Sequence, residues 1–301
     1  MSTIYTTSLY SSERVPELGQ TLDQVHLLRL DLQGGEAPGN KVFKLRANLA
    51  NAKASGVSRI VSFGGSWSNH LHALAAVGAE LGIETIAIVR GGERETAMLS
   101  DARRLGMKLI AVSREEYRRR SDPDYQRALE QQFSPCILVP EGAANPAGVQ
   151  GCVDIAQLIN EQGRRWRRVV VSVGTGTTLA GLAAGLDCAQ ELVGVSALKG
   201  AKDLEERIVG ALAESGLSAK LPWHVLHDYH CGGFARVNDS LRTFITNFEQ
   251  AHQVPLEPVY TGKMLLAIHS QVASGQWSRN DSILAIHTGG LQGRRGYSWL
   301  S

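Results

Sequence analysis

The sequence predicts an α/β protein in which parallel strands are flanked by helices. From residue 58 onward, short apolar runs alternate with longer segments of helical period, which is typical of parallel strands joined by crossover helices. A second series of this kind begins after residue 147. A chain of 301 residues fits either one large α/β domain or two lobes that share a cleft. Because there are two series, we expect two lobes.

The first series predicts the smaller lobe. Its first strand ends in two glycines, and the next helix begins after Ser68, which we expect to be the N-cap. An Asp-Pro pair interrupts the last helical segment. The segments are expected in the order strand (59–65), helix (68–82), strand (84–92), helix (97–106), strand (108–113), broken helix (115–133), and strand with a loop (136–148).

The second series predicts the larger lobe, onto which we also expect the amino-terminal segment to pack. Its segments are expected in the order helix (151–162), strand with a glycine-rich turn and helix (168–186), strand (191–198), helix (239–252), and strand with a Gly-Gly turn (281–290). We therefore assign residues 1–50 and 147–301 to the larger domain and residues 51–146 to the smaller domain.

Composition argues against several classes of protein. The net charge of +2 lacks the basic excess of a dedicated nucleic-acid binder. No run of eighteen apolar residues predicts a membrane span, and the amino terminus has no basic start followed by an apolar run. We expect a soluble, cytoplasmic protein with neither a nucleic-acid nor a membrane partner.

The cysteines predict neither disulfides nor a metal site. They are widely spaced, contain no Cys-x-x-Cys pair, and are expected to be reduced thiols: Cys136, Cys152, Cys188 and Cys231. One group lies close enough in sequence to leave a metal site as a weaker alternative: His224, His227, His230 and Cys231. That group lacks the paired spacing of known ligand sets, so we expect no metal.

The segment VGTGTTLAGL predicts a phosphate site. Its small residues lie between a β-branched strand and an alanine-rich helix: Gly174, Thr175, Gly176, Thr177 and Thr178. Backbone N–H groups at a helix amino terminus favour a phosphate. A dinucleotide fingerprint would need a third glycine where this chain has Leu179, and a P-loop would need a lysine. A small monophosphate fits better, with a plain β–α turn as the alternative.

Five motifs occur in an order that resembles one enzyme family. They are GNKVFKL, GGSWSNHLHALAA, VGTGTTLAGL, LEPVYTGKM and IHTGG. From about Leu28 to Tyr297 the chain resembles the D-cysteine desulfhydrase and 1-aminocyclopropane-1-carboxylate (ACC) deaminase family of pyridoxal 5'-phosphate (PLP) enzymes. The resemblance implies the two-domain tryptophan synthase β-like fold (fold type II), with PLP in the interdomain cleft, a small amino acid as substrate, and a homodimer.

The resemblance also implies residue roles. Lys41 would hold PLP as a Schiff base, since burial and a nearby positive group would lower the pKa of its amine and leave it nucleophilic. Lys44, one helical turn further on, could meet the cofactor phosphate. Asn69 would hydrogen-bond the phenolic oxygen of PLP, and Ser68 would act in catalysis and hold the substrate carboxylate together with Asn69. His70 is either a substrate-binding or a structural histidine.

The carboxyl-terminal motifs suggest the reaction. Tyr260 resembles a catalytic aromatic residue near the cofactor ring, Thr261 stands where the deaminase branch has a glutamate, and Thr288 would address the pyridine nitrogen. A hydroxyl leaves that nitrogen neutral, which suffices to expel a thiol but not to open a cyclopropane. We therefore expect D-cysteine desulfhydrase-like α,β-elimination to pyruvate, ammonia and sulfide. ACC deamination and a non-catalytic phosphate- or dinucleotide-binding module remain alternatives.

Three departures from the family pattern concern the substrate. Ser66 and Trp67 replace the usual Val-Gln before the Ser-Asn pair, which would put an indole near the entrance. His72 stands where arginine is common. Phe234, which we expect in the substrate pocket, aligns with a tyrosine. The substrate could therefore differ from both D-cysteine and ACC.

Overall fold

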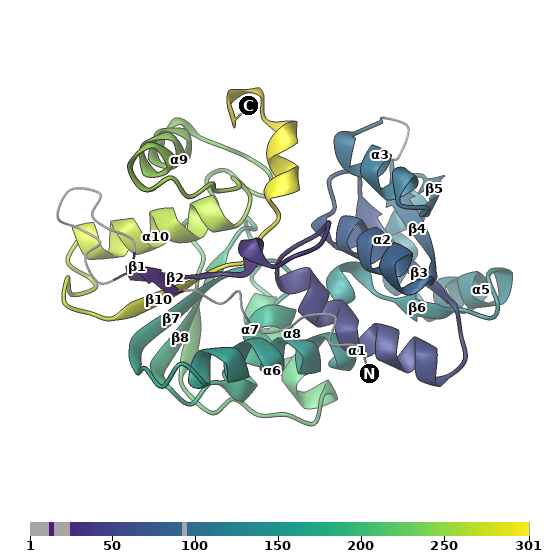
Figure 1. Ribbon diagram of the computed structural model, residues 1–301, viewed down its shortest axis with the longest axis horizontal. Helices are drawn as coiled ribbons and strands as arrows, with labels where there is room; N and C mark the ends of the chain where they lie inside the picture. The colour runs from purple at the N-terminus through teal and green to yellow at the C-terminus, as the bar shows by residue number, and fades with distance from the viewer. Residues whose placement is uncertain (1–11, 15–24, 92–94, 301) are drawn as a thin grey trace.

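The computed structural model describes residues 12–14, 25–91 and 95–300. Within the amino-terminal segment 1–50 that we expect on the larger lobe, residues 1–11 and 15–24 therefore lie outside the described residues. Figure 1 shows two lobes side by side, each with a sheet covered by helices. No helix in the described part of the chain is both long and apolar enough to cross a membrane.

The larger lobe contains a six-stranded sheet. All neighbouring strands are parallel except the first pair, which is antiparallel. The strand order is β1 (Ser12–Arg14), β2 (Val25–Arg29), β10 (Ile283–His287), β7 (Trp166–Val173), β8 (Ala189–Ser196) and β9 (Trp223–Leu226). The central strands are nearly continuous apolar runs, as expected for a parallel sheet buried on both faces.

Helices cover both faces of this sheet (Figure 1). Two apolar cores lie between the helices and the strands, one on each face. The first face carries α6 (Pro146–Asn160), α7 (Thr177–Gly185) and α8 (Leu204–Glu214). The second face carries α9 (Asp239–His252) and α10 (Thr261–Ala273).

The smaller lobe contains a four-stranded parallel sheet. The strand order is β5 (Lys108–Val112), β4 (Glu84–Arg90), β3 (Arg59–Gly65) and β6 (Ile137–Val139). One face packs on α2 (Asn69–Leu81) and α3 (Ala97–Arg104), and the other packs on α4 (Arg114–Arg118) and α5 (Pro123–Gln132). The short 3-10 helices are η1 (Leu30–Leu32), η2 (Arg119–Ser121), η3 (Glu141–Ala143), η4 (Leu291–Gly296) and η5 (Ser298–Leu300).

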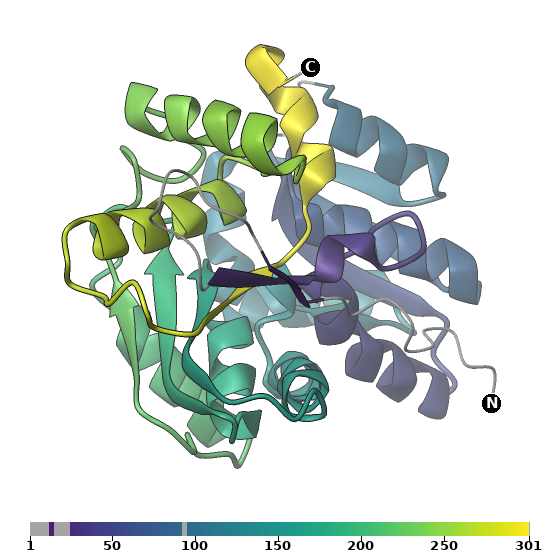
Figure 2. The same ribbon diagram turned by 60° about the vertical axis from the view of Figure 1, so that its left-hand side comes forward.

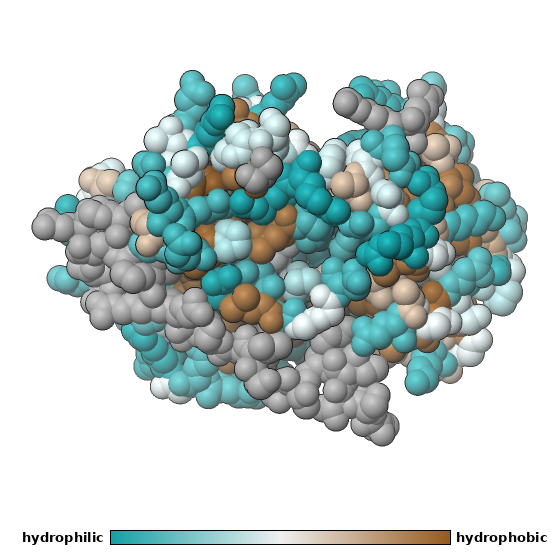
Figure 3. Space-filling view, turned by 45° about the horizontal axis from the view of Figure 1, so that its top comes forward, coloured by the Kyte–Doolittle hydropathy of each residue, from teal (hydrophilic) through white to brown (hydrophobic). Residues whose placement is uncertain are grey.

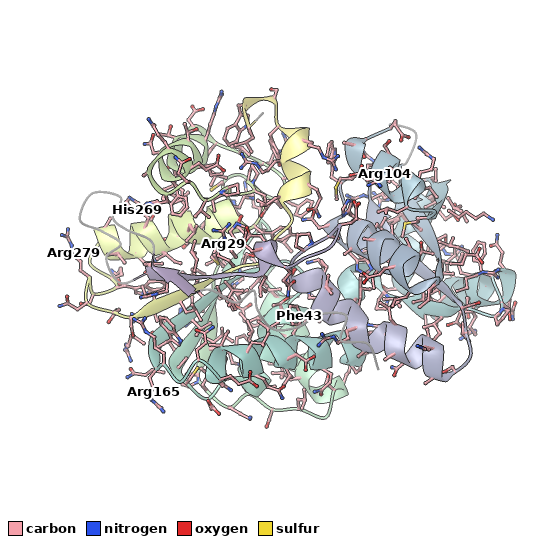
Figure 4. All side chains as sticks on the ribbon, viewed as in Figure 1. Arg29, Phe43, Arg104, Arg165, His269 and Arg279 are labelled. Carbon is pink, nitrogen blue, oxygen red and sulfur yellow. The ribbon has the colours of Figure 1, made fainter. Side chains whose placement is uncertain are left out.

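Helix α1 (Asn40–Ala54) belongs to the cores of both lobes. Phe43 packs in the core of the larger lobe, whereas Leu45 and Leu49 pack in that of the smaller lobe. Figure 4 shows Phe43 on α1 close to the junction of the lobes. Gly151 of α6 faces the Phe43 carbonyl so closely that a Cβ there would lie 1.9 Å from the oxygen. Our domain boundary at residue 51 falls inside α1, and the boundaries stay a prediction.

The carboxyl-terminal segment spans the two lobes. In both Figure 1 and Figure 2 the last residues, in yellow, lie between α9 and α3. Arg294 pairs with Glu249 of α9, and the adjacent Arg295 pairs with Asp101 of α3. Two neighbouring arginines therefore tie η4 to opposite lobes.

Candidate active site

Helix α1 begins directly against the end of strand β10. Its N-cap, Gly39, has φ 133° and forms an isolated bridge with Gly289. A Cβ on Gly39 would lie 2.4 Å from the Thr288 carbonyl oxygen, so only glycine fits this close approach. The backbone N–H of Asn40 donates to the same oxygen at 3.1 Å. These contacts fix the position of the next residue, Lys41, beside the carboxyl ends of the central strands.

Lys44 is buried on α1, and Lys41 lies half-buried beside it. Burial lowers the pKa of Lys41 to about 7, and the charge of Lys44 adds to the decrease. Burial also lowers the pKa of Lys44, whose side chain is 3% exposed. This agrees with the low Lys41 pKa that the sequence predicts. At neutral pH an appreciable share of Lys41 is a free, nucleophilic amine.

The glycine-rich turn lies beside these lysines. Asn40 Nδ2 donates to Thr178 Oγ1 at 2.9 Å, which joins α1 to the first turn of α7. Gly176, the N-cap of α7, is left-handed with φ 93°, and the hydroxyls of Thr175 and Thr177 are 2.9 Å apart. The free N–H groups at this helix end and its dipole favour an anion.

The loop before α2 brings two more predicted residues to the lobe junction. Ser68 is the N-cap of α2, as the sequence predicts, and its Oγ accepts from the Leu71 backbone N–H at 3.2 Å. Asn69 Oδ1 accepts from Gln292 Nε2 at 3.3 Å. Gly290 lies close to the same amide, since a Cβ there would be 2.6 Å from Asn69 Nδ2. Asn69 therefore reaches from the smaller lobe to the segment that follows Thr288.

His70 is buried behind this loop. Its Nε2 is 2.8 Å from Ser62 Oγ, and that hydroxyl donates to the Val139 carbonyl at 2.7 Å. Because Ser62 uses its only proton there, it must accept from His70, which leaves the Nδ1 of His70 unprotonated. Burial, followed by the charges of Lys41 and Lys44, lowers the pKa of His70 to about 3. His70 is a neutral, buried histidine, and its predicted role as a substrate ligand stays a prediction.

His72 faces the carboxyl-terminal segment. Its Nε2 lies 3.3 Å from Asp101 Oδ2, the carboxylate that also pairs with Arg295. Burial lowers the pKa of His72, and Asp101 opposes that decrease. The residue that replaces the common arginine thus takes part in the contact between α2, α3 and η4.

The start of α10 carries Tyr260 and Thr261 together with an acid that the sequence did not reveal. The carboxylate of Glu257 accepts from the backbone N–H groups of Val259, Tyr260 and Thr261 at 2.8, 2.5 and 2.7 Å. Thr261 Oγ1 donates to the Glu257 carbonyl at 3.2 Å and accepts from its N–H at 2.9 Å. Burial raises the pKa of Glu257, and the three N–H donors oppose that rise. The Thr261 hydroxyl is therefore committed to Glu257.

Tyr260 connects the glycine turn to Phe234. A Cβ on Gly174 would lie 3.1 Å from the Tyr260 hydroxyl oxygen, so the phenol packs directly on the turn. The rings of Tyr260 and Phe234 meet edge to face with centroids 6.1 Å apart. Burial raises the pKa of Tyr260, and Glu257 adds to the rise. The tyrosine is neutral at physiological pH.

Thr288 follows β10, and a buried ionic group missed from the sequence lies behind it. Thr288 Oγ1 is 3.4 Å from Ser172 Oγ at the end of β7. The preceding His287 has Nδ1 3.0 Å from Asp31 Oδ1, and Arg29 donates to both oxygens of Asp31 at 2.8 and 2.7 Å. Burial alone would raise the pKa of Asp31, but the hydrogen bonds from Arg29 and His287 lower it. Figure 4 marks Arg29 at the end of β2.

The histidines considered as metal ligands, His224, His227 and His230, contact different partners rather than one shared point. His227 pairs with Glu205 at 2.7 Å, and His224 lies 3.8 Å from Glu191. His230 Nδ1 instead accepts from a backbone N–H. No cluster of three or more potential ligands occurs among the residues that the structure describes.

Comparison with known proteins identifies the family. The sequence profile described as "Pyridoxal-phosphate dependent enzyme" matches residues 2–289. The chain belongs to this family. PLP is accordingly its cofactor, and the predictions of a PLP-dependent enzyme and of its fold class are confirmed.

Relatives of this PLP-dependent enzyme include "D-cysteine desulfhydrase" from Salmonella newport (strain SL254). It is 30% identical over 300 residues, which cover 92% of this chain and 90% of the relative. A crystal structure described as an "ACC deaminase homologue" shares the fold with a TM-score of 0.79 at 22% identity, over 96% of this chain and 94% of that one. The structure of threonine deaminase isoform 2 from Solanum lycopersicum shares the fold with a TM-score of 0.68 at 16% identity, over 95% of this chain and 84% of that one.

The residues at this site fit PLP. Lys44 is buried and Lys41 is half-buried beside it, and no ion pair joins either amine to a carboxylate in the part of the chain that the structure describes. Two neighbouring ammonium groups repel each other, so a bound anion would stabilise the charged form of both lysines. The glycine turn presents N–H and hydroxyl donors for a phosphate beside the reactive amine. This PLP-dependent enzyme thus has donors of the kind its cofactor needs.

Proposed function

We propose that the protein is a PLP-dependent lyase that removes the β-substituent of a small amino acid, with D-cysteine or a related D-amino acid as the preferred substrate. The products would be pyruvate, ammonia and sulfide. The observation that carries this proposal is the half-buried Lys41, whose pKa is lowered to about 7 and which lies beside a glycine-rich turn. The 30% identity to D-cysteine desulfhydrase supports the substrate.

Lys41 would hold the cofactor through its Nζ, and the glycine turn would hold the phosphate. Lys44 would neutralise part of the phosphate charge, because it is buried beside Lys41 without a paired carboxylate among the described residues. The hydrogen bond from Asn40 to Thr178 holds the start of α1, which carries Lys41, next to the glycine turn. Bound PLP supplies an electron-withdrawing group that makes the α-proton of an amino acid more acidic.

Lys41 Nζ would also move the α-proton of the substrate. A group whose pKa is near the working pH serves best as acid and base, and a value of about 7 meets that condition. Ser68 and Asn69 would hold the substrate at the start of α2, where the helix dipole favours its carboxylate. His70 stays neutral and adds no charge beside that carboxylate.

Tyr260 and Thr288 would flank the cofactor. Tyr260 packs on Gly174, and its raised pKa leaves it a hydrogen-bond donor. Thr288 offers a hydroxyl, which cannot hold a proton on a pyridine nitrogen as a carboxylate would. The weaker electron withdrawal suffices to expel a thiol, whereas opening a cyclopropane requires more. This favours desulfhydration over ACC deamination.

The experiment is to incubate the purified holoenzyme with D-cysteine, L-cysteine, β-chloro-D-alanine and ACC, and to measure the 2-oxo acid formed, which is pyruvate from the first three compounds and 2-oxobutanoate from ACC. We expect pyruvate from D-cysteine and β-chloro-D-alanine. We also expect a cofactor absorbance band near the visible edge that is lost on borohydride reduction and in Lys41→Ala. A 2-oxo acid formed from ACC alone, as 2-oxobutanoate, would refute the proposal, and so would a protein that gains no band with added PLP.

We further propose a homodimer in the cytoplasm and the domain division at residues 51 and 147. The resemblance to the D-cysteine desulfhydrase and ACC deaminase family implies the homodimer. Light scattering of the holoenzyme would measure the mass directly, and a single-chain mass of 32.5 kDa would contradict the dimer.

A further inference from the structure

Two large aromatic side chains are exposed at the junction of the lobes. Of the described residues, the large hydrophobics that are strongly exposed include Trp67 at 42% and Phe234 at 52%. Scattered apolar residues on a surface need no explanation, but neighbouring ones at a site entrance do. Trp67 directly precedes Ser68 and Asn69 in the smaller lobe, and Phe234 packs on Tyr260 in the larger one. Figure 3 shows the surface hollowed where the lobes meet.

A chain of contacts links these two rings around the site. The indole of Trp67 lies over Gly296, where a Cβ would be 3.3 Å from Trp67 Cζ2. The next residue, Tyr297, donates its hydroxyl to the Ala235 carbonyl at 3.2 Å. Ala235 in turn follows Phe234. Residues 296 and 297 therefore connect the exposed aromatic residue of one lobe with that of the other.

The loop that carries Phe234 is held in a costly conformation. Cys231 and Ala235 have φ values of 52° and 56°, which L-residues rarely adopt, and the glycines at 232 and 233 are also positive. Each non-glycine residue of this kind costs about 1 kcal/mol or more. Buried Lys263 secures the loop, since its Nζ donates to the Gly233 carbonyl at 2.8 Å. The hydrogen bond from buried Lys263 therefore helps to hold the strained loop in which Phe234 is exposed.

We propose that Trp67 and Phe234 form an aromatic rim that binds an apolar, preferably aromatic, group on the β-sulfur of the substrate. The preferred substrates would then be S-substituted cysteines such as S-benzyl-D-cysteine. This inference rests on the proposed elimination and names its substrate class. An apolar substituent that extends out of the site would cover exposed aromatic surface, which is favourable, whereas the thiol of cysteine is too short to do so.

The reaction balances without an added oxidant or reductant. The Cα–H and Cβ–S bonds break, the Cα–H electron pair becomes the Cα=Cβ bond, and the Cβ–S pair leaves with sulfur. The sulfur takes a proton and departs as the thiol. Water then replaces nitrogen, so the S-substituted cysteine and one water give pyruvate, ammonia and R–SH. Lys41 Nζ would accept the α-proton, as in the proposed reaction on D-cysteine.

The test compares pyruvate formation from S-benzyl-D-cysteine and D-cysteine by the holoenzyme. We expect a higher kcat/KM for the benzyl compound. Phe234→Ala and Trp67→Ala should each lower the ratio of the two kcat/KM values by about tenfold, because one ring contact is lost. Val209→Ala is the matched control, since Val209 is 56% exposed on α8 and has no part in the site. It should leave the ratio unchanged.

A binding measurement separates recognition from turnover. In Lys41→Ala, which lacks the catalytic amine, calorimetry should give a Kd for S-benzyl-D-cysteine at least tenfold lower than for D-alanine. Adding Phe234→Ala should remove that advantage. Equal Kd values for S-benzyl-D-cysteine and D-alanine would overturn the proposal of an aromatic rim.

The outcomes distinguish this inference from the proposed function. If neither compound yields pyruvate, the proposed function fails. If D-cysteine is consumed but S-benzyl-D-cysteine is at least tenfold poorer, the rim is wrong and the proposed function stands. If the two aromatic variants change the mass of the assembly while the kcat/KM ratio stays constant, the rings are a contact between copies of the chain, and the inference is overturned.

Discussion

Lys41 acquires its reactivity from its surroundings rather than from its own chemistry. An exposed lysine keeps its proton at neutral pH, but this one is half-buried next to a second, buried amine. Both effects disfavour the charged form, which lowers the pKa. The same second amine would be needed to hold a phosphate. Lys44 thus serves the site twice, once through its charge and once through its position on α1.

Replacing Lys44 by Met should raise the pKa of Lys41 above its value of about 7, because one of the two causes of the decrease is removed. The measurement is the pH dependence of the rate at which PLP forms its absorbance band with the apoprotein. The midpoint should move to higher pH even if binding becomes weaker. Lys53→Met, an exposed change on the same helix, is the control and should leave the midpoint in place. An unmoved midpoint in Lys44→Met would contradict the electrostatic coupling.

His70 should remain neutral across the physiological range. Its pKa of about 3 in the folded protein lies below the ordinary value of 6.5. Between these two values the unfolded chain binds a proton that the folded chain does not, so this residue makes the protein less stable as the pH falls from 6.5 toward 3, by roughly 1 kcal/mol per pH unit. Nitrogen-15 NMR of labelled histidines should show one Nε2–H signal set, absent in His70→Asn, that does not titrate between pH 5 and 8. Titration of that signal above pH 5 would refute the buried arrangement.

At the scale of elements, helix ends build the site. Lys41 lies in the first turn of α1, and Ser68 and Asn69 lie at the start of α2. The glycine turn forms the start of α7, and Tyr260 directly precedes α10. These ends meet because they follow, or are pinned to, the carboxyl ends of parallel strands, where ligands of open α/β sheets bind. Each end also needs partners for its free N–H groups.

Glu257 supplies those partners at α10, so Glu257→Ala should destabilise the protein. Three backbone N–H groups would lose their acceptor, at a cost of about 1–3 kcal/mol in the free energy of unfolding. Glu257→Gln keeps one carbonyl oxygen and should cost less. Denaturant unfolding measures both, with Glu206→Ala, an exposed acid in the first turn of α8, as the control. Equal stability of Glu257→Ala and the control would show that the cap is dispensable.

At the scale of the whole molecule, α1 makes the two lobes one unit. Its side chains fill both apolar cores, and it carries both lysines of the site. The segment η4 adds a second link through Arg294 and Arg295. A substitution that disturbs the interface of α1 and α6 should therefore lower both the stability of the protein and its affinity for PLP.

Gly151→Ala tests this coupling. The added Cβ would collide with the Phe43 carbonyl, so α1 and α6 must separate, which should cost about 1–3 kcal/mol in stability and weaken PLP binding. Gly210→Ala is the matched control, because Gly210 lies inside α8 with nothing within 4 Å of an added Cβ, and it should stabilise the helix by up to about 1 kcal/mol. Thermal unfolding and PLP titration measure the two effects. An unaffected PLP affinity in Gly151→Ala would mean that α1 does not transmit the change.

The sequence by itself determined the order of most elements and the residues of the contiguous motifs. Hydrophobic period, N-caps and glycine stops act over a few residues, so the strands and helices of the smaller lobe and the Ser68 cap could be predicted. The sequence pattern does not predict β2, α8, β9 and α10, because their apolar runs are short or coincide with motifs that carry no clear period.

Only the tertiary structure decided what those residues do to one another. Glu257 and the buried group of Arg29, Asp31 and His287 come from positions with no local signal, and their pairing depends on strands that neighbour each other only in the fold. The loop that exposes Phe234 likewise receives a hydrogen bond from Lys263 to Gly233, two residues that are thirty positions apart in sequence. Propensity and capping are local properties, whereas burial, pKa and exposure follow from which distant segments pack together, and that is fixed only once the chain has folded.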